Sequence, residues 1–372
     1  PDEEALAERQ AAGQGLTRPE IAVLVSYAKH TLYQELLGSD LAEDPCLVPE
    51  LERYFPRPLR ERFGAGIQTH RLRREILASS VANRLVNRTG STFVFRLQEE
   101  LGVDAAAAVR AYIVAWEVFG LRRLWSAVAE LDTRVPDPLQ RLMLSSAARL
   151  MARTSRWLLK NGDADAKVVE RIERYRGRVQ ELGGRLPELV DEGHQAALEE
   201  SAAPLREAGV PEDLAVWVAG FDLLSRAFDL VDVADACAVD VGAAAQAYFA
   251  MGAVLELDWL ATRIHALPTQ DRWLAEARAG FRDELLAHHR SLCIAVLTGE
   301  MPEASGVTRL EAWRTQHQPA VDSWLRLLAE LNTQDEPDLA MLSVALRAVQ
   351  RLAASAVREG LGRRQAAGAP SL

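Results

Sequence analysis

Apolar residues recur at helical spacing along most of this 372-residue chain, and this pattern constrains the fold more than any other feature. The clearest case follows Pro136 and Pro138, where apolar residues return every three or four positions as far as Leu158. That spacing is typical of an amphipathic helix, and proline is well tolerated in a first helical turn. No segment shows the strict alternation of apolar and polar residues that marks a strand. The sequence therefore predicts an all-α fold.

Capping signals set the starts of two further helices. Thr17 is followed by Pro19 and Glu20 in the pattern of a capping box, and Asp104 stands as an N-cap before an alanine-rich helical stretch. The stretch 45–66 differs, because it carries four prolines. It predicts a loop-rich connector with two short helical turns.

Two segments of the chain resemble each other. Residues 103–113 read VDAAAAVRAYI, residues 239–249 read VDVGAAAQAYF, and the alignment continues without a gap until Leu124 falls on Leu260. Chance similarity between alanine-rich helix starts is the alternative. The shared N-cap, the Ala-Tyr pair and the downstream spacing favour a tandem duplication of a unit. We therefore expect two related helical bundles, with additional N-terminal and C-terminal helices.

Glycines and prolines indicate boundaries between four parts. Gly183 and Gly184 form the clearest internal break, and a run of Gly, Pro and Ser precedes the last two predicted helices, which end at Leu361. We expect an N-terminal helix with its connector, a first bundle, a second bundle, and C-terminal helices with a disordered tail. These parts cover residues 1–66, 67–184, 185–300 and 301–372.

Composition excludes some classes of partner. A net charge of -10 and a pI of about 5.4 argue against nucleic acid, which is usually bound by a basic patch. Three cysteines far apart in the sequence suit a reducing cytoplasm. No apolar run approaches the ~20 residues that cross a membrane. We expect a cytoplasmic protein that has neither nucleic acid nor a membrane as partner.

Motifs for catalysis or cofactor binding are weak. A dinucleotide site needs three spaced glycines between a strand and a helix, whereas the glycine pairs at 13–15 and 64–66 lack both the third glycine and the strand. Glu284 and His288 lie four residues apart, but no partner Glu-x-x-His occurs on another helix, so a hydrogen-bonded core or interface histidine is favoured over a metal ligand. We therefore assign no catalytic, cofactor-binding or metal-binding residue, and expect no cofactor in this chain.

Two asparagines stand out within a predicted helix. Asn83 and Asn87 fall on one helical face with Leu72, Ile76 and Val86, where apolar residues are expected. A buried amide is costly unless it is hydrogen-bonded. One interpretation is a polar contact to another domain or a ligand. The favoured alternative is a core hydrogen-bond network that fixes the helix in place.

Basic residues cluster around these asparagines in an otherwise acidic chain. The cluster consists of His70, Arg71, Arg73, Arg74, Arg84 and Arg88. Arginines on helix faces often pair with carboxylates across an interface, and no glycine-rich phosphate cradle is present. A docking surface for a preceding domain is therefore favoured over an anion site. The candidates for an interdomain or anion contact are His70, Arg74, Asn83, Asn87 and Arg88.

Two long segments of the chain have a distinctive sequence. Residues 15–40 read GLTRPEIAVLVSYAKHTLYQELLGSD, and residues 70–121 run from HRLRREILASSVANRLVNRTG to AWEVFGL. Here, and more loosely over most of its length, the chain resembles the C-terminal region of the large bacterial NAD-specific glutamate dehydrogenases. The resemblance implies a very long, self-associating parent enzyme that oxidises L-glutamate to 2-oxoglutarate and ammonium and reduces NAD.

The resemblance also implies a role for this region. In that family the glycine-rich cofactor loop and the catalytic lysines and aspartate precede the segment that matches residues 15–19, so none of them is carried over to a position here. The implied role is a non-catalytic helical domain that supports or assembles the catalytic core of the same chain, in a homo-oligomer. The alternative is a regulatory domain whose basic cluster binds a small anionic effector.

Overall fold

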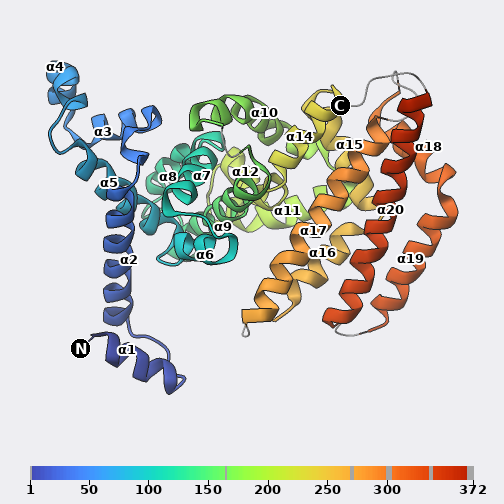
Figure 1. Ribbon diagram of the computed structural model, residues 1–372, viewed down its shortest axis with the longest axis horizontal. Helices are drawn as coiled ribbons and strands as arrows, with labels where there is room; N and C mark the ends of the chain where they lie inside the picture. The colour runs from blue at the N-terminus through green and yellow to red at the C-terminus, as the bar shows by residue number, and fades with distance from the viewer. Residues whose placement is uncertain (1, 164–165, 269–271, 299–303, 335–337, 367–372) are drawn as a thin grey trace. The chain divides into compact units, whose positions relative to one another are not determined.

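The computed structural model describes residues 2–163, 166–268, 272–298, 304–334 and 338–366 (Figure 1). All regular secondary structure in these residues is helical, which confirms the predicted all-α fold. The chain divides into two compact units. Unit 1 comprises Pro1–Gly177 with Leu205–Ser225, and unit 2 comprises Arg178–Pro204 with Arg226–Leu372.

Unit 1 is built mainly from the first half of the chain, and α10 continues from it into unit 2. The bounds of its helices are α1 (Asp2–Ala11), α2 (Arg18–Gly38), η1 (Leu41–Glu43), η2 (Pro45–Leu47), α3 (Val48–Tyr54), α4 (Arg57–Gln68), α5 (Arg73–Thr89), α6 (Phe93–Leu101), α7 (Ala105–Val118), α8 (Leu121–Glu130), α9 (Asp137–Asn161), α10 (Val168–Leu189), α12 (Glu212–Ala219) and α13 (Phe221–Leu224).

Helix α7 lies at the centre of unit 1, where it contacts α2, α6, α8 and α9. Its residues Ala108, Val109, Ala111, Val114 and Ala115 are completely buried. These small and medium-sized side chains let the surrounding helices approach α7 closely. The start of α7 is fixed by the Asp104 carboxylate, as predicted.

Unit 2 is formed by the later helices. Their bounds are α11 (Glu192–Glu207), which begins in unit 2, α14 (Ala227–Cys237), α15 (Val241–Val254), α16 (Leu257–Ala266), α17 (Arg272–Leu297), α18 (Gly306–Gln316), α19 (Gln318–Asn332) and α20 (Leu339–Ala366).

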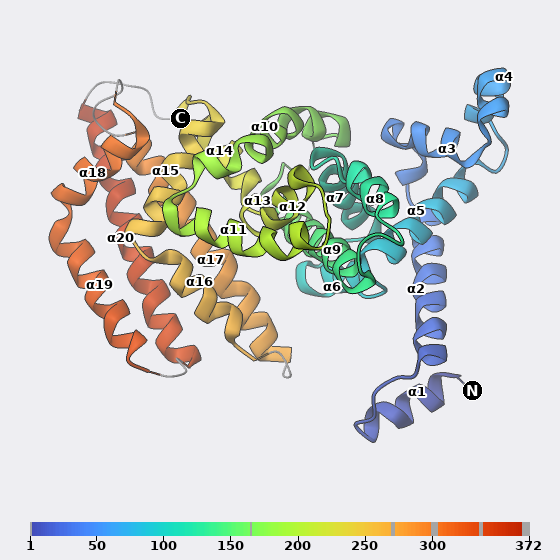
Figure 2. The ribbon, with the colours of Figure 1, turned by 180° about the vertical axis from the view of Figure 1, so that it is seen from behind.

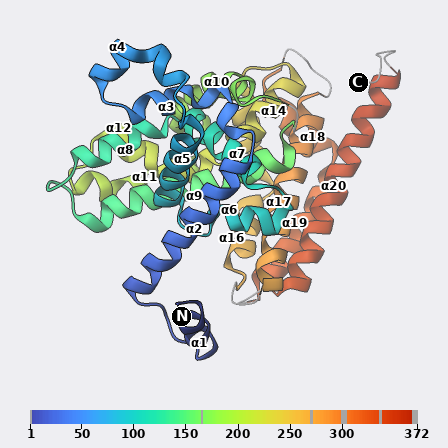
Figure 3. The same cartoon turned by 60° about the vertical axis from the view of Figure 1, so that its left-hand side comes forward.

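The core of unit 2 is centred on α17. This helix lies beside α20 and also contacts α14, α15, α16 and α18 (Figure 3). Leu292 of α17, and Leu342 and Val349 of α20, are completely buried along the α17–α20 contact. Helix α19 covers another side of α20, as the reverse view shows (Figure 2). Apolar residues at helical spacing on both long helices therefore supply the central contact of this unit.

Helices of equal or similar length occur at the matching positions of the two resembling segments. Helices α7 and α15 begin after Asp104 and Asp240, whose carboxylates accept hydrogen bonds from the backbone N–H of Ala107 (2.7 Å) and Ala243 (2.9 Å). Helix α16 follows α15 in the same register in which α8 follows α7, and α17 begins one residue before the position that matches the start of α9. The helix bounds agree with the sequence alignment, while duplication itself remains a prediction.

The segment 45–66 is more helical than its prolines predict. It forms η2, α3 and most of α4. Pro45, Pro49 and Pro58 each lie in the first turn of one of these helices, where proline sacrifices no hydrogen bond. The prediction of a loop-rich connector is therefore wrong.

Three further helix ends differ from prediction. Helix α10 does not stop at Gly183 and Gly184 but continues to Leu189. The first of the last two predicted helices, expected from about Leu310 to Leu331, is split in two, because Pro319 opens α19 directly after α18. Helix α20 reaches Ala366, past its predicted end, while residues 299–303 of the predicted break and 367–372 of the predicted tail lie outside the described residues. The four-part division of the chain remains a prediction.

One described helix is long and apolar enough to cross a membrane, which corrects the expectation that no such run exists. By length and composition it is Leu339–Glu359 of α20, with 44% of its most apolar window buried. Helices α14 and α15 would give a second span if that pair, bent by 112°, acted as one. Core helices of soluble proteins pass the same test, so this is weak evidence of membrane insertion.

Candidate functional site

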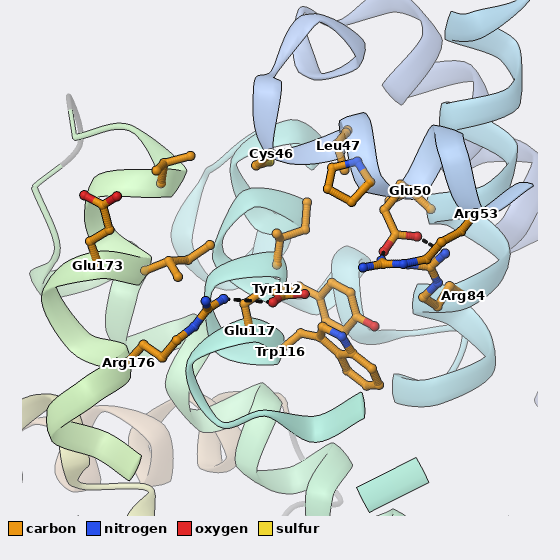
Figure 4. Close-up of a pocket in the computed structure, with 15 residues that line it drawn as sticks. Cys46, Leu47, Glu50, Arg53, Arg84, Tyr112, Trp116, Glu117, Glu173 and Arg176 are labelled. Carbon is orange, nitrogen blue, oxygen red and sulfur yellow. Dashed lines mark hydrogen bonds and ion pairs between the residues drawn. The ribbon is translucent and has the colours of Figure 1, made fainter. Parts of the chain in front are cut away.

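A pocket of ≈270 Å³ lies within unit 1 between η2, α3, α5, α7 and the first turns of α10. We call it the Glu50 pocket (Figure 4). Its walls combine aliphatic, aromatic and charged side chains. The lining residues are Cys46, Leu47, Pro49, Glu50, Arg53, Val81, Arg84, Tyr112, Ile113, Trp116, Glu117, Val169, Ile172, Glu173 and Arg176.

Glu50 anchors one side of the pocket. It is buried, and it forms ion pairs with Arg53 of the same helix (2.5 Å), with Arg84 of α5, and with Arg122 of α8 (3.4 Å). Burial alone would raise the pKa of Glu50. The hydrogen bond and charge of Arg84, with the charges of Arg53 and Arg122, outweigh burial and hold this pKa below its usual value. The result is an ionised carboxylate surrounded by three guanidinium groups.

The opposite side of the pocket carries a second charged group. Arg176 of α10 donates a hydrogen bond to Glu117 of α7 over 2.9 Å. Glu173 lies one turn before Arg176 on α10, and its exposed carboxylate forms no hydrogen bond or ion pair with any described residue. Figure 4 shows Glu173 and Arg176 across the pocket from Glu50, Arg53 and Arg84. The pocket therefore has charged groups at two separated sides.

Aromatic side chains of α7 form the wall between these two sides. The rings of Tyr112 and Trp116 lie 6.2 Å apart, and Trp116 is 4% exposed. The guanidinium of Arg88 lies 3.7 Å from the centre of the Trp116 ring and donates to the Tyr112 hydroxyl over 3.4 Å. The buried Trp116 Nε1–H has no hydrogen-bond acceptor among the described residues. Buried donors are normally paired, so this N–H is an unsatisfied polar group in the pocket wall.

Unit 2 holds a second group of charged side chains. His194 of α11 lies between two carboxylates, with Nδ1 2.5 Å from Asp191 and Nε2 3.2 Å from Asp258 of α16. Arg226 also donates to Asp258, over 2.8 Å. The hydrogen bond to Asp258 is the main cause that raises the pKa of His194, and it exceeds the opposing effect of burial. This group joins three separate segments of unit 2.

His289 of α17 is a neutral core residue. Its ring stacks on Tyr248 at 3.6 Å, and its Nε2–H donates to the Tyr248 carbonyl over 2.9 Å, since a carbonyl only accepts. Burial lowers the pKa of His289 to about 3. The sequence favoured His288 as a hydrogen-bonded core or interface histidine; His288 is half-buried, and its neighbour His289 occupies the core.

The asparagines predicted to face the core are exposed, so that interpretation is wrong. Asn83 Nδ2 donates to the Ser79 carbonyl one turn back over 3.0 Å, and Asn87 lies on the same exposed face of α5. The predicted neighbour Leu72 is 51% exposed. The buried face of α5 is formed by Leu77, Ala78, Val81, Ala82, Leu85 and Val86.

The other sequence candidates are spread along α5 and its approach. His70 Nδ1 accepts a hydrogen bond from the Leu72 N–H over 3.1 Å. Arg74 donates to the carbonyls of Leu37 and Ser39, each over 2.9 Å, and thereby closes the end of α2. Arg88 lies in the aromatic stack described above. These side chains do not share one site, and an interdomain or anion contact through them remains a prediction.

Sequence analysis missed Glu50 and the His194 group. Arg84 belonged to the predicted basic cluster, and pairing with a carboxylate was the expected use of its arginines. The carboxylate itself gave no local signal, because Glu50 lies in the segment that was predicted to be a loop-rich connector. The same is true of Asp258 and His194, which lie far apart in the sequence.

Helix α2 presents an apolar face that is covered over only half its length. Leu32 and Leu36, in its C-terminal half, are buried against unit 1. Ile21 continues this face toward the N-terminus but is 47% exposed, and Leu24 and Tyr27, at successive i+3 positions around the helix from Ile21, are 37% and 47% exposed. Figure 1 shows this half of α2 extending away from α5 toward α1. The uncovered half is a candidate docking surface.

The two glycine pairs do not form a dinucleotide-binding turn. Gly13 and Gly15 lie between α1 and α2, whereas Gly64 and Gly66 lie inside α4. No strand precedes either pair in the described part of the chain. These residues do not fit the pyrophosphate of NAD, so no step of nicotinamide chemistry is assigned to them.

Comparison with known proteins places the chain in a family. The family described as "Glutamate dehydrogenase, C-terminal" matches residues 13–351. The chain is 37% identical over 355 residues to the NAD-specific glutamate dehydrogenase of Pseudomonas aeruginosa, 34% over 358 residues to that of Halomonas elongata, and 35% over 352 residues to that of Mycobacterium tuberculosis. Each match covers 95% of this chain and 22% of the relative, so the chain spans about a fifth of the length of these curated relatives. The chain belongs to the glutamate dehydrogenase C-terminal family.

Proposed function

We propose that this chain is the non-catalytic helical domain of a cytoplasmic, homo-oligomeric NAD-dependent glutamate dehydrogenase, and that it supports and helps to assemble the catalytic core. The parent reaction would convert L-glutamate, NAD and water to 2-oxoglutarate, ammonium and NADH. The family match and the share of the relatives that it covers support this assignment. The uncovered half of α2 is the observation that carries the proposed role.

The apolar face of α2 has the properties of a docking surface for the core. Its C-terminal half already packs on α5 and α7, so the helix is held in place at one end. Full burial of a large apolar side chain contributes about 1.5–3 kcal/mol. Ile21, Leu24 and Tyr27 are 37–47% exposed, so covering all three would contribute roughly 2–4 kcal/mol. That is enough to bias docking of a segment belonging to the same polypeptide.

Substitution of exposed apolar residues of α2 in the full-length enzyme tests the proposal. The double variant Ile21→Ser/Leu24→Ser should weaken docking, lower the melting temperature of the enzyme and reduce its assembled mass in light scattering. The matched control is Phe95→Ser/Leu142→Ser, which removes two residues that are 60% and 47% exposed on α6 and α9. Unchanged mass, stability and glutamate-dependent NADH formation in the α2 variant would refute the supporting role.

A further inference from the structure

The charges around the Glu50 pocket are unevenly distributed between its two sides. On one side, the single negative charge of Glu50 is surrounded by Arg53, Arg84 and Arg122, which leaves an excess of positive charge. On the other side, Glu117 pairs with Arg176, and the carboxylate of Glu173 adds a second negative charge to the lining. A ligand with charges of both signs would match this distribution better than a simple anion or cation would.

One unused hydrogen-bonding group lies on the Glu173 side of the pocket, and another lies in the aromatic wall between the two sides. The Glu173 carboxylate has no partner among the described residues and can accept from an ammonium group. The Trp116 Nε1–H is buried without an acceptor and can donate to a carboxylate oxygen. A bound molecule that carries one ammonium and one carboxylate group would satisfy both.

The apolar lining of the pocket determines which kind of chain can connect the two charged groups of the ligand. Aliphatic side chains, including Val81, Ile113 and Ile172, also line the pocket. The volume of ≈270 Å³ is just below the range typical of drug-sized ligands and suits a small metabolite. A short methylene chain between two charged ends would fill it without burying further polar groups.

We propose that the Glu50 pocket binds a small linear ω-amino acid, with its carboxylate at the arginine side and Trp116, and its ammonium group at Glu117 and Glu173. The site is separate from the docking face of α2. It is also distinct from the anion site considered for the basic cluster, because the preferred ligand carries no net charge. The inference does not depend on the supporting function proposed above.

Calorimetric titration of the complete 372-residue chain tests the ligand class. The probes are 4-aminobutyrate and two compounds that each lack one of its charges, butyrate and butylamine. We expect 4-aminobutyrate to bind at least tenfold more tightly than either, and 3-aminopropionate and 6-aminohexanoate to show how the length fits. Equal or tighter binding of butyrate or butylamine would overturn the proposal. Tighter binding of L-valine, whose two charges are adjacent, than of 4-aminobutyrate would also overturn it. The same holds if every ω-amino acid binds with a dissociation constant above about 10 mM.

Variants then locate the binding site. Glu173→Gln removes the unpaired carboxylate at an exposed position and should weaken 4-aminobutyrate binding about tenfold, while leaving the circular dichroism and melting temperature unchanged. Trp116→Phe removes the indole N–H but keeps an aromatic ring, and should also weaken binding. The control Glu99→Gln makes the same change of charge on the exposed surface of α6 in the same unit. Equal affinity in Glu173→Gln and Glu99→Gln would refute the assignment to this pocket.

Discussion

Two residues of unit 2 adopt a left-handed backbone conformation at positions where unit 1 has glycine. Ala238 ends α14 with φ 52° and ψ 43°, and Glu256 precedes α16 with φ 50° and ψ 35°. In the register that aligns 103–113 with 239–249, the corresponding residues of unit 1 are Gly102 (φ 66°) and Gly120 (φ 62°). This conformation costs a residue with a Cβ about 1–2 kcal/mol, and glycine avoids the cost. At these two aligned positions, unit 2 therefore carries backbone strain that unit 1 avoids.

Replacement of Ala238 by glycine should stabilise unit 2. Relief of the left-handed conformation contributes about 1–2 kcal/mol, and the greater freedom of glycine in the unfolded chain offsets about 0.5–1 kcal/mol of this. The net gain is roughly 0.5–1 kcal/mol, which corresponds to a rise in melting temperature of about 1–4 °C for a unit of this size. The reverse change, Gly102→Ala, should destabilise unit 1 by a similar amount. A Cβ at Gly102 would meet no atom within 4 Å, so its cost is confined to the backbone.

Scanning calorimetry of the complete chain measures both effects. The matched control is Ala197→Gly, at an exposed position inside α11 of unit 2. The chemical change is the same, but glycine inside a helix should lower stability by about 0.5–1 kcal/mol. The two Ala-to-Gly variants should therefore shift the melting temperature in opposite directions. If Ala238→Gly lowers it as Ala197→Gly does, the reasoning from backbone strain is refuted.

Two further predictions concern unit 2. Because Asp258 and Asp191 raise the pKa of His194, its contribution to stability is complete below the unfolded pKa of about 6.5 and is lost as the pH rises through the folded pKa. Melting temperatures between about pH 6 and pH 9 should therefore fall more in the wild type than in His194→Gln, and parallel curves would contradict this. Gly306→Ala would place a Cβ 2.8 Å from the Ala247 Cβ, and it should destabilise the folded chain by about 1–3 kcal/mol. In contrast, the Cβ of Gly280→Ala enters open space within α17, so this change should stabilise the folded chain by about 0.5–1 kcal/mol. Equal melting temperatures of the two glycine variants would show that the α15–α18 contact adapts freely.

Local chemistry made much of the helical framework predictable. The Thr17 N–H and hydroxyl both donate to Glu20 at the start of α2, over 2.6 and 2.7 Å, as the capping signal indicates. Asp104 and the proline before α9 likewise fix helix starts through interactions within a few residues. The same reasoning failed for segment 45–66, because it treated proline as a helix breaker. Proline in a first turn favours the helix that follows it.

The asparagines of α5 show why a helical face cannot be assigned from periodicity alone. The prediction extended the helix back to Leu72 and took this leucine as a marker of the buried side. Leu72 has φ -100° and ψ 26°, so it precedes the regular helix and its side chain leaves the helical pattern. Which side of α5 is buried depends on α2, α3 and α9, which pack against it from elsewhere in the chain. Local spacing predicts a helix here, but tertiary contacts decide which face is buried.

The two units show why the pocket itself was beyond sequence reasoning. Helices α7 and α15 share their length, caps and a buried tyrosine, at Tyr112 and Tyr248. Where α7 has Trp116 beside the Glu50 pocket, α15 has Gly252, and the His289 ring lies 3.3 Å from the position of a Cβ there. The same helical arrangement thus surrounds a hollow in one unit and a packed histidine in the other. Helix caps and small residues determine how these helices are arranged. The few side chains that line the pocket come from segments far apart in the sequence, so its chemistry could not be predicted from any one segment.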